Sequence, residues 1–143
     1  MKAFPSKLKE LIEDNGLSKV DISKYLGLNN KTKLYAWLNG KNTPRIETIL
    51  KFANLFNCSI DYLVGRTDNF IEVHKNPNPD FAKQLKKVLK ACKVSQYRLL
   101  KDNIVSQGHL NSWFNDKMMP NLDNIIKLAD YLNISIDYLV GRE

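Results

Sequence analysis

The sequence predicts an all-α protein made of two tandem five-helix domains. The octapeptide SIDYLVGR stands at Ser59–Arg66 and again at Ser135–Arg142, 76 positions further on. The match extends upstream, because 11 of 17 positions agree between residues 50–66 and 126–142. Apolar residues recur at helical spacing in both copies, and no stretch alternates as a core strand would. Repetition on this scale indicates two copies of one folded module.

The alignment of the two copies also sets the expected domain limits. Pro44 aligns with Pro120 at an offset of 76, whereas Phe4 aligns with Phe81 at an offset of 77, so the first copy has one extra residue between 28 and 34. We expect a first domain at 1–66, a linker at 67–80 and a second domain at 81–143. A chain of 143 residues has room for two small domains of about 60–65 residues each.

The linker TDNFIEVHKNPNPD contains two prolines and three asparagines, which disfavour a helix. Its Phe70, Ile71 and Val73 are apolar, so we expect the segment to be partly anchored on a domain.

Each helix is predicted from an apolar face and from its end signals. In the first helix Phe4, Leu8, Leu11 and Ile12 share one face, and the sixth helix repeats this pattern. Five serines stand where N-caps are expected, at 18, 59, 95, 106 and 135. The expected helices span residues 5–14, 19–26, 30–39, 46–56, 60–64, 80–91, 96–102, 107–115, 122–132 and 136–140.

Composition narrows the classes of function. The net charge is +7, and the basic excess lies in the two repeats rather than in the acidic joint. A basic excess suits a polyanionic partner, with nucleic acid first. His74 and His109 are the only histidines, and no Ser/His/Asp grouping, metal-ligand spacing or Gly-rich phosphate loop occurs. We therefore expect no enzyme activity, no cofactor, no metal and no small-molecule ligand.

Other sequence features bear on location. Cys58 and Cys92 stand singly, which favours structural thiols. No apolar run approaches the roughly 20 residues of a membrane span, and the N-terminal residues have no apolar core of a secretory signal. We expect a cytoplasmic protein that does not contact a membrane.

The second and third helices of each copy are short and separated by a tight turn. They read SKVDISKYLGLNNKTKLYAWLNG and SQYRLLKDNIVSQGHLNSWFND. With Leu17-Ser18, Gly27-Leu28, the WLNG at 37–40, the proline before the fourth helix and the SIDYL ending, each copy resembles the lambda-repressor/Cro-type (xenobiotic response element) helix-turn-helix family. The resemblance covers both copies nearly end to end. It implies lambda-repressor-like domains, double-stranded DNA as partner and a transcriptional regulator that acts as a repressor.

The physics of DNA binding agrees with the resemblance. A helix about 10–12 Å across fits the major groove of B-DNA, provided that the domain holds it at a fixed angle. We expect the third helix of each domain to protrude from the domain surface and to present its N-terminal residues to base edges. The expected core anchors are Ile22, Leu26, Leu34 and Trp37 in the first copy, and Leu99, Val105, Leu110 and Trp113 in the second.

The candidate base-reading residues differ between the copies. Asn and Gln suit adenine, whereas Lys reaches guanine or a phosphate. Gly108 reads no base and only leaves room for a close approach of the backbone to DNA. For His109 two interpretations stay open, a solvated surface residue and a phosphate contact. In the first copy the candidates are Asn29, Asn30, Lys31, Thr32 and Lys33, with Ala36 one turn on. In the second they are Ser106, Gln107, Gly108 and His109, with Ser112 one turn on.

The resemblance also implies phosphate contacts at the start of the second helix and after the third. A solvated lysine is the simpler interpretation for each cationic member of this set. Carried over residue by residue, the set is Lys19, Asn39 and Lys41 in the first copy, and Gln96, Asn115 and Lys117 in the second.

Both copies depart from the family pattern at the turn. The extra residue leaves the register of the first reading helix open by one position. The second copy has Ile104 where the first has Gly27, and a β-branched residue is costly if φ is positive there. Asn103 is able to take the left-handed position instead, with a shifted turn. Leu100 also replaces the small Ser23, where the two helices pack.

These departures leave an alternative function open. Domain 2, or both domains, would then be a protein-interaction module that has lost specific DNA binding. RNA is a weaker candidate, because Tyr35 is the only aromatic residue available for base stacking on the presumed reading helices and an A-form major groove does not admit a helix.

Two unlike reading helices in one chain predict an asymmetric DNA site. The linker reaches at most about 46–50 Å when extended, so adjacent grooves are accessible. Tethering raises the effective concentration of the second domain. The short last helices carry more apolar residues than a five-residue helix usually buries, which suggests a homodimer or a domain contact. The residues concerned are Ile60, Tyr62 and Val64, with Ile136, Tyr138 and Val140.

Overall fold

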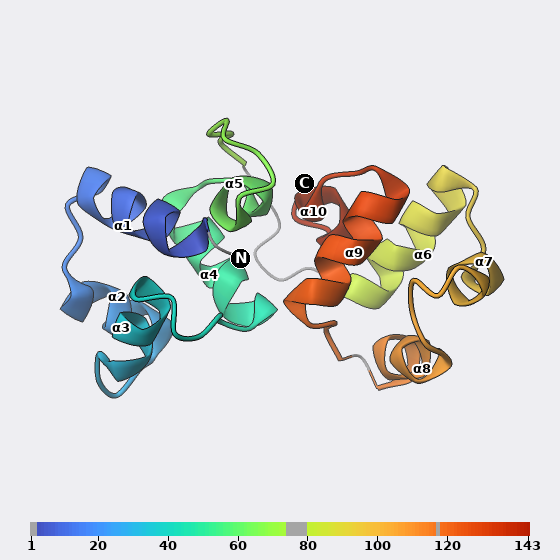
Figure 1. Cartoon of the computed structure of the whole chain (residues 1–143), viewed down its shortest axis with the longest axis horizontal. Helices are drawn as coiled ribbons and strands as arrows, with labels where there is room; N and C mark the ends of the chain where they lie inside the picture. Colours follow the sequence, from blue (N-terminus) through green and yellow to red (C-terminus); the bar gives the residue numbers. More distant parts are fainter. Residues whose placement is uncertain (1–2, 74–79, 117) are drawn as a thin grey trace. The chain divides into compact units, whose positions relative to one another are not determined.

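The computed structural model describes residues 3–73, 80–116 and 118–143 of the chain. These residues form two compact units, one of residues 3–73 with helices α1–α5 and one of residues 80–116 and 118–143 with helices α6–α10 (Figure 1). The predicted all-α class and the two tandem five-helix domains are confirmed. The helices are α1 Phe4–Asp14, α2 Lys19–Leu26, α3 Thr32–Leu38, α4 Ile46–Phe56, α5 Ile60–Val64, α6 Phe81–Cys92, α7 Gln96–Lys101, α8 Gln107–Asn115, α9 Leu122–Leu132 and α10 Ile136–Val140.

The core of domain 1 is built around the aromatic ring of Phe52 in α4. This ring is fully buried and meets Trp37 edge-on, with the ring centroids 5.8 Å apart and the planes at 86°. Phe4 of α1 and Phe56 of α4 lie at centroid distances of 6.2 and 6.3 Å from the same ring. Such aromatic pairs contribute about 0.5–1.5 kcal/mol beyond their buried area. The contact with Trp37 fixes α3 on the domain.

Domain 2 fixes its third helix by a different aromatic contact. Leu128 is fully buried at the position that corresponds to Phe52. Trp113 of α8 instead meets Phe81 of α6 edge-on, with ring centroids 5.8 Å apart and planes at 84°. Both tryptophans are core residues, as predicted, with 7% and 3% of their surface exposed.

The five predicted N-cap serines all cap helices. Each hydroxyl oxygen accepts a hydrogen bond from the backbone N–H three residues further on, at 3.0 or 3.1 Å. Each bond satisfies one backbone donor that the first helical turn leaves without an intrahelical partner. The caps are Ser18 for α2, Ser59 for α5, Ser95 for α7, Ser106 for α8 and Ser135 for α10.

The repeated octapeptide forms a short helix, and the arginine that follows the helix contacts the aspartate within it. Asp137 in α10 makes an ion pair with Arg142, and Asp61 in α5 makes the same pair with Arg66. In each copy the backbone N–H of the arginine also donates to the backbone carbonyl of the aspartate at 2.8 Å. The glycine between them, Gly65 or Gly141, takes a φ of 85° or 90°, which reverses the chain toward the aspartate. The octapeptide therefore contains both the N-cap and the C-cap of its own helix.

The surplus apolar surface expected on α5 and α10 is absent. Ile60, Val64, Ile136 and Val140 are buried, because α5 packs on α1 and α4 while α10 packs on α6 and α9. Only Tyr62 and Tyr138 stay half-buried. The apolar residues therefore give no reason for a dimer through these helices.

Residues 67–73 are anchored on domain 1, as the apolar residues of the joint suggested. The Ser59 N–H donates to the Ile71 carbonyl at 3.0 Å, and the Val73 N–H donates to the Asn57 carbonyl at 3.2 Å. Val73 is buried, whereas Phe70 and Ile71 remain about half exposed. The first unit thus extends past residue 66.

Two side chains of α1 and α5 hold the start of this segment. The Lys7 ammonium lies 4.1 Å from the ring centroid of Tyr62 and 3.3 Å from Asp68, and Tyr62 also meets Phe70 edge-on at 5.4 Å. Asp80, at the end of the predicted linker, caps α6. Residues 74–79, with His74, lie outside the described part of the chain.

Candidate nucleic-acid interface

In domain 1 the α2–α3 pair stands on a buried base. The four predicted anchors, Ile22, Leu26, Leu34 and Trp37, are all buried, with 8% exposure or less. Gly27 ends α2 at a φ of 72°, the left-handed conformation expected of a turn glycine. Because Leu34 and Trp37 occupy the inner face of α3, its outer face is left to solvent.

The reading helix of domain 1 begins later than predicted. We expected a helix from residue 30, but α3 starts at Thr32. The Asn30 side-chain oxygen accepts a hydrogen bond from the Thr32 N–H at 2.9 Å, which replaces a serine-type cap two residues before the helix. Asn29, Asn30 and Lys31 therefore lie in the loop that precedes α3.

The remaining candidates of domain 1 lie on α3 and at the two flanks. Thr32 and Lys33 are exposed in the first turn, and Ala36 is half-buried one turn on. The Lys19 ammonium, at the start of α2, lies 5.5 Å from the ring centroid of Tyr35 in α3. Asn39 and Lys41 are exposed where α3 ends.

In domain 2 the α7–α8 pair has the same base. The predicted anchors Leu99, Val105, Leu110 and Trp113 are buried, with 7% exposure or less. The helix α8 begins at Gln107 as expected, with Ser106 as its cap. Gln107, Gly108 and His109 are exposed in its first turn. Leu110 is the fourth residue of α8, whereas Leu34 is the third of α3, so the two reading helices start at different points relative to their anchors.

The turn of domain 2 solves the missing glycine as the sequence suggested. Asn103 takes the left-handed conformation, with a φ of 55°, and Ile104 is half-buried beyond it. The turn is shifted because α7 ends at Lys101, one residue earlier than predicted. Leu100 stays half-buried where domain 1 has the buried Ser23.

A model of helix-turn-helix proteins matches the chain twice, over residues 8–63 and 76–139. The chain belongs to the lambda-repressor/Cro-type helix-turn-helix family. The two matches confirm the tandem copies, and the family indicates that the partner of the chain is DNA. No curated protein and no solved structure matches the chain significantly.

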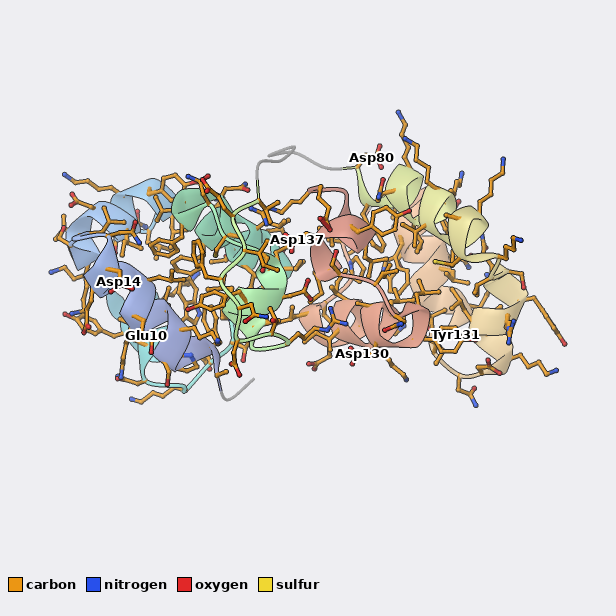
Figure 2. All side chains as sticks on the ribbon, turned by 90° about the horizontal axis from the view of Figure 1, so that it is seen from above. Glu10, Asp14, Asp80, Asp130, Tyr131 and Asp137 are labelled. Carbon is orange, nitrogen blue, oxygen red and sulfur yellow. The ribbon has the colours of Figure 1, made fainter. Side chains whose placement is uncertain are left out.

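The second helix-turn-helix has a support that sequence analysis missed. The Lys127 ammonium donates to the Asn103 carbonyl at 3.1 Å, and the Tyr131 hydroxyl donates to the Asp102 carboxylate at 2.6 Å. Both donors belong to α9, at whose end Tyr131 lies (Figure 2). The hydrogen bond to Asp102 raises the pKa of the Tyr131 hydroxyl above its usual 10.0. The i, i+4 spacing in α9 was readable in the sequence, but nothing linked it to a turn more than 20 residues upstream.

Two further contacts shape the outer face of α8. The Gln107 side-chain N–H donates to the Asn111 side-chain oxygen at 3.0 Å. The His109 ring stacks on Trp113, with centroids 5.6 Å apart and planes at 3°. Asn111 was not among the predicted residues, although its i, i+4 spacing from Gln107 places both amides on one face.

The flanks of the second helix-turn-helix match the first in position. Gln96 is exposed as the first residue of α7, and Asn115 is exposed as the last residue of α8. Ser112 is half-buried one turn after the predicted reading residues. Lys117 lies outside the described residues.

The electrostatics of the two helices suit a polyanion. Neither α3 nor α8 contains an acidic residue.

Among the residues that the structure describes, no group of three or more His, Cys, Asp or Glu could hold a metal ion. No helix within the described ranges is long and apolar enough to cross a membrane.

Proposed function

We propose that the protein is a sequence-specific transcriptional regulator of double-stranded DNA, acting as a repressor, that reads DNA with α3 and α8. The observation that carries the proposal is that both helix-turn-helix units expose an acid-free reading helix over a buried base. A helix held in this way is able to enter the major groove and contact base edges with its first turn.

The base contacts are assigned by side-chain chemistry. The Gln107 amide keeps a second N–H and its oxygen while it donates to Asn111, so it can still make a bidentate contact with adenine. In domain 1, Lys33 and Thr32 begin the helix and Lys31 precedes it, so this domain favours guanine or phosphate contacts. Asn29 and Asn30 approach DNA from the loop.

The phosphate contacts are assigned to the flanks of each reading helix. Lys19 and Gln96 are the first residues of α2 and α7, the helices that would cross the DNA backbone. The other flank residues lie at or after the ends of α3 and α8. These contacts fix register but carry no sequence information. The set comprises Lys19, Asn39, Lys41, Gln96 and Asn115, with Lys117 added from the sequence alone.

The first test is selection of bound duplexes from a random library with the full chain, followed by competition. We expect the selected duplex to bind about 10³-fold or more tightly than random duplex at about 0.15 M salt. Affinity for both should fall steeply with salt, because phosphate contacts release counterions. A selected duplex that fails to outcompete random DNA would overturn the proposal.

The repressor sign needs a separate test. A selected site placed over a promoter should reduce reporter output when the protein is expressed, because the bound chain excludes the polymerase. A reporter whose output rises instead would make the protein an activator while leaving DNA recognition intact.

A protein-interaction role for domain 2 is a second candidate, favoured by one observation. Tyr97 in α7 and Met118 after α8 expose 71% and 59% of their surface. Large exposed apolar side chains can mark a protein contact. In that case Gln107→Met leaves the affinity for the selected duplex unchanged, whereas our proposal expects a loss of about tenfold or more.

A further inference from the structure

The turn between α7 and α8 is held from outside the helix-turn-helix. The carbonyl of Asn103 accepts from Lys127 at 3.1 Å, and the carboxylate of Asp102 accepts from Tyr131 at 2.6 Å. Two consecutive turn residues are thus bound by two side chains one turn apart on α9. These two contacts are called the α9 clamp below.

The α9 clamp lies at a residue with a left-handed backbone. Asn103 has a φ of 55°, a conformation that L-residues other than glycine adopt uncommonly. Residues with such backbones persist where their surroundings hold them in place. The clamp supplies such surroundings, because it holds the residue that bends the chain and the residue before it.

Domain 1 differs from domain 2 at this turn. Its turn uses Gly27 at a φ of 72°, which needs no support. The α4 residues that correspond to Lys127 and Tyr131 are Lys51 and Leu55. Leu55 has no hydroxyl, so the tyrosine half of the clamp is absent there.

We infer that Lys127 and Tyr131 are positioning residues for DNA recognition by domain 2, acting through the α7–α8 turn on the angle of α8. This inference rests on the proposed function. The turn connects directly to Ser106 and Gln107, so a displaced turn moves the first reading residue. Recognition geometry depends on such supporting contacts, since small displacements misplace the hydrogen bonds to bases.

The first experiment examines the turn without DNA. Tyr131→Phe and Lys127→Met are compared with the wild-type chain by amide hydrogen exchange, with Lys51→Met as the matched change in α4. We expect the Ile104 N–H, which donates to Leu99 at 2.9 Å, to exchange about fivefold faster in the two clamp variants. Lys51→Met should leave it unchanged. An unchanged exchange rate in both clamp variants would contradict the inference.

The second experiment measures discrimination by each half of the selected site. The clamp variants should lose about tenfold in their preference for the half read by domain 2 over a scrambled half, and nothing for the other half. Lys127→Arg, which keeps a donor, should restore most of the preference. The unfolding midpoint reported by Trp113 should stay near the wild-type value.

The salt dependence separates positioning from direct contact. If Lys127 touched a phosphate, Lys127→Met would lower the salt slope by about 1. Positioning leaves that slope unchanged, so a lowered slope would overturn the assignment. Faster exchange with full discrimination would reduce the clamp to a structural contact. A wild-type chain without specific binding defeats the proposed function instead, and the exchange experiment still reports on the clamp.

Discussion

Arg142 is 1% exposed, which is an uncommon place for a guanidinium group. The side chains of Arg142 and its partner Asp137 expose 0% and 2% of their surface, whereas those of Arg66 and Asp61 in domain 1 expose 23% and 11%. Removing one member of a buried pair leaves an uncompensated charge, while water screens a partly exposed one. The same octapeptide thus has different energetics in the two domains.

The pair gives a prediction on stability. Arg142→Met should destabilise domain 2 by about 3–5 kcal/mol, because Asp137 stays buried without its cation. Arg66→Met should cost domain 1 only about 1–2 kcal/mol. Urea unfolding is followed by the single tryptophan of each domain, in a Trp37→Phe or Trp113→Phe background. The double variant Asp137→Asn with Arg142→Met should lose less than Arg142→Met alone, and equal losses in the two domains would contradict this account.

The Tyr131 hydroxyl gives a prediction on pH. Its hydrogen bond to Asp102 favours the protonated phenol and raises the pKa above 10.0, while the nearby Arg98 opposes this shift. The stabilisation is therefore fully present below about pH 10 and is lost as pH rises through the raised pKa. Asp102→Asn should lower the pKa of Tyr131 in an NMR titration, and Asp123→Asn at the other end of α9 serves as control. A pKa that does not move with Asp102→Asn would remove the hydrogen bond as its cause.

At the scale of the element, the two inter-helix turns use different residues for one left-handed position. Gly27 has open space around it, since an added Cβ would meet no atom within 4 Å. The cost of a side chain there is therefore a backbone cost alone. Asn103 already bears this cost, which is smaller for asparagine than for most residues.

This contrast gives a prediction on the turns. Gly27→Ala should destabilise domain 1 by about 1–2 kcal/mol, and Gly27→Asn by less. Asn103→Gly should be close to neutral, whereas Asn103→Ala should cost about 1 kcal/mol. The measurement is urea unfolding with the tryptophan of the affected domain. A wild-type stability for Gly27→Ala would show that the turn does not require a positive φ.

On the scale of the whole molecule, the chain carries two reading helices of different chemistry. Domain 1 offers Lys31, Thr32 and Lys33, while domain 2 offers Gln107 and the stacked His109. A single chain therefore lacks the two-fold symmetry that a palindromic site would match. Where both domains bind one duplex, as we propose, each raises the local concentration of the other.

The tandem arrangement predicts a selected site with two unlike halves. Gln107→Met should relax selection at one position of one half, whereas Lys31→Met should weaken the other half. Lys90→Met, which removes the same charge from the exposed face of α6, is the matched control and should change neither half. Selection of one half only would mean that a single domain reads DNA.

The fold was predictable because its signals are local. Helical periodicity, five serine caps and the repeat itself determine the elements, and the buried anchors followed from the spacing of Ile22, Leu34 and Trp37. The start of α3 was missed because the Asn30 side chain accepts from the Thr32 N–H, a local turn that offers the backbone an alternative to a helical start at residue 30.

The site was less predictable because its supports are distant in sequence. The contacts of Lys127 and Tyr131 with the α7–α8 turn join residues from separate helices, and neither pattern nor spacing relates them. The burial of Ile60 and Ile136 was also misjudged, since a short helix can bury most of its surface when two long helices enclose it.

The identity of α5 and α10 has a consequence for the folding of the chain. Each of these helices carries the same five residues, IDYLV, so its own sequence does not assign it to one domain rather than the other. Tandem repeats are prone to such exchanged assembly while they fold. The helices that enclose them differ, because Phe52 and Phe56 of α4 stand where α9 has Leu128 and Leu132. Fidelity of assembly must therefore come from these longer helices and from the order of synthesis, and replacing both phenylalanines by leucine would bring the two docking surfaces closer to interchangeable.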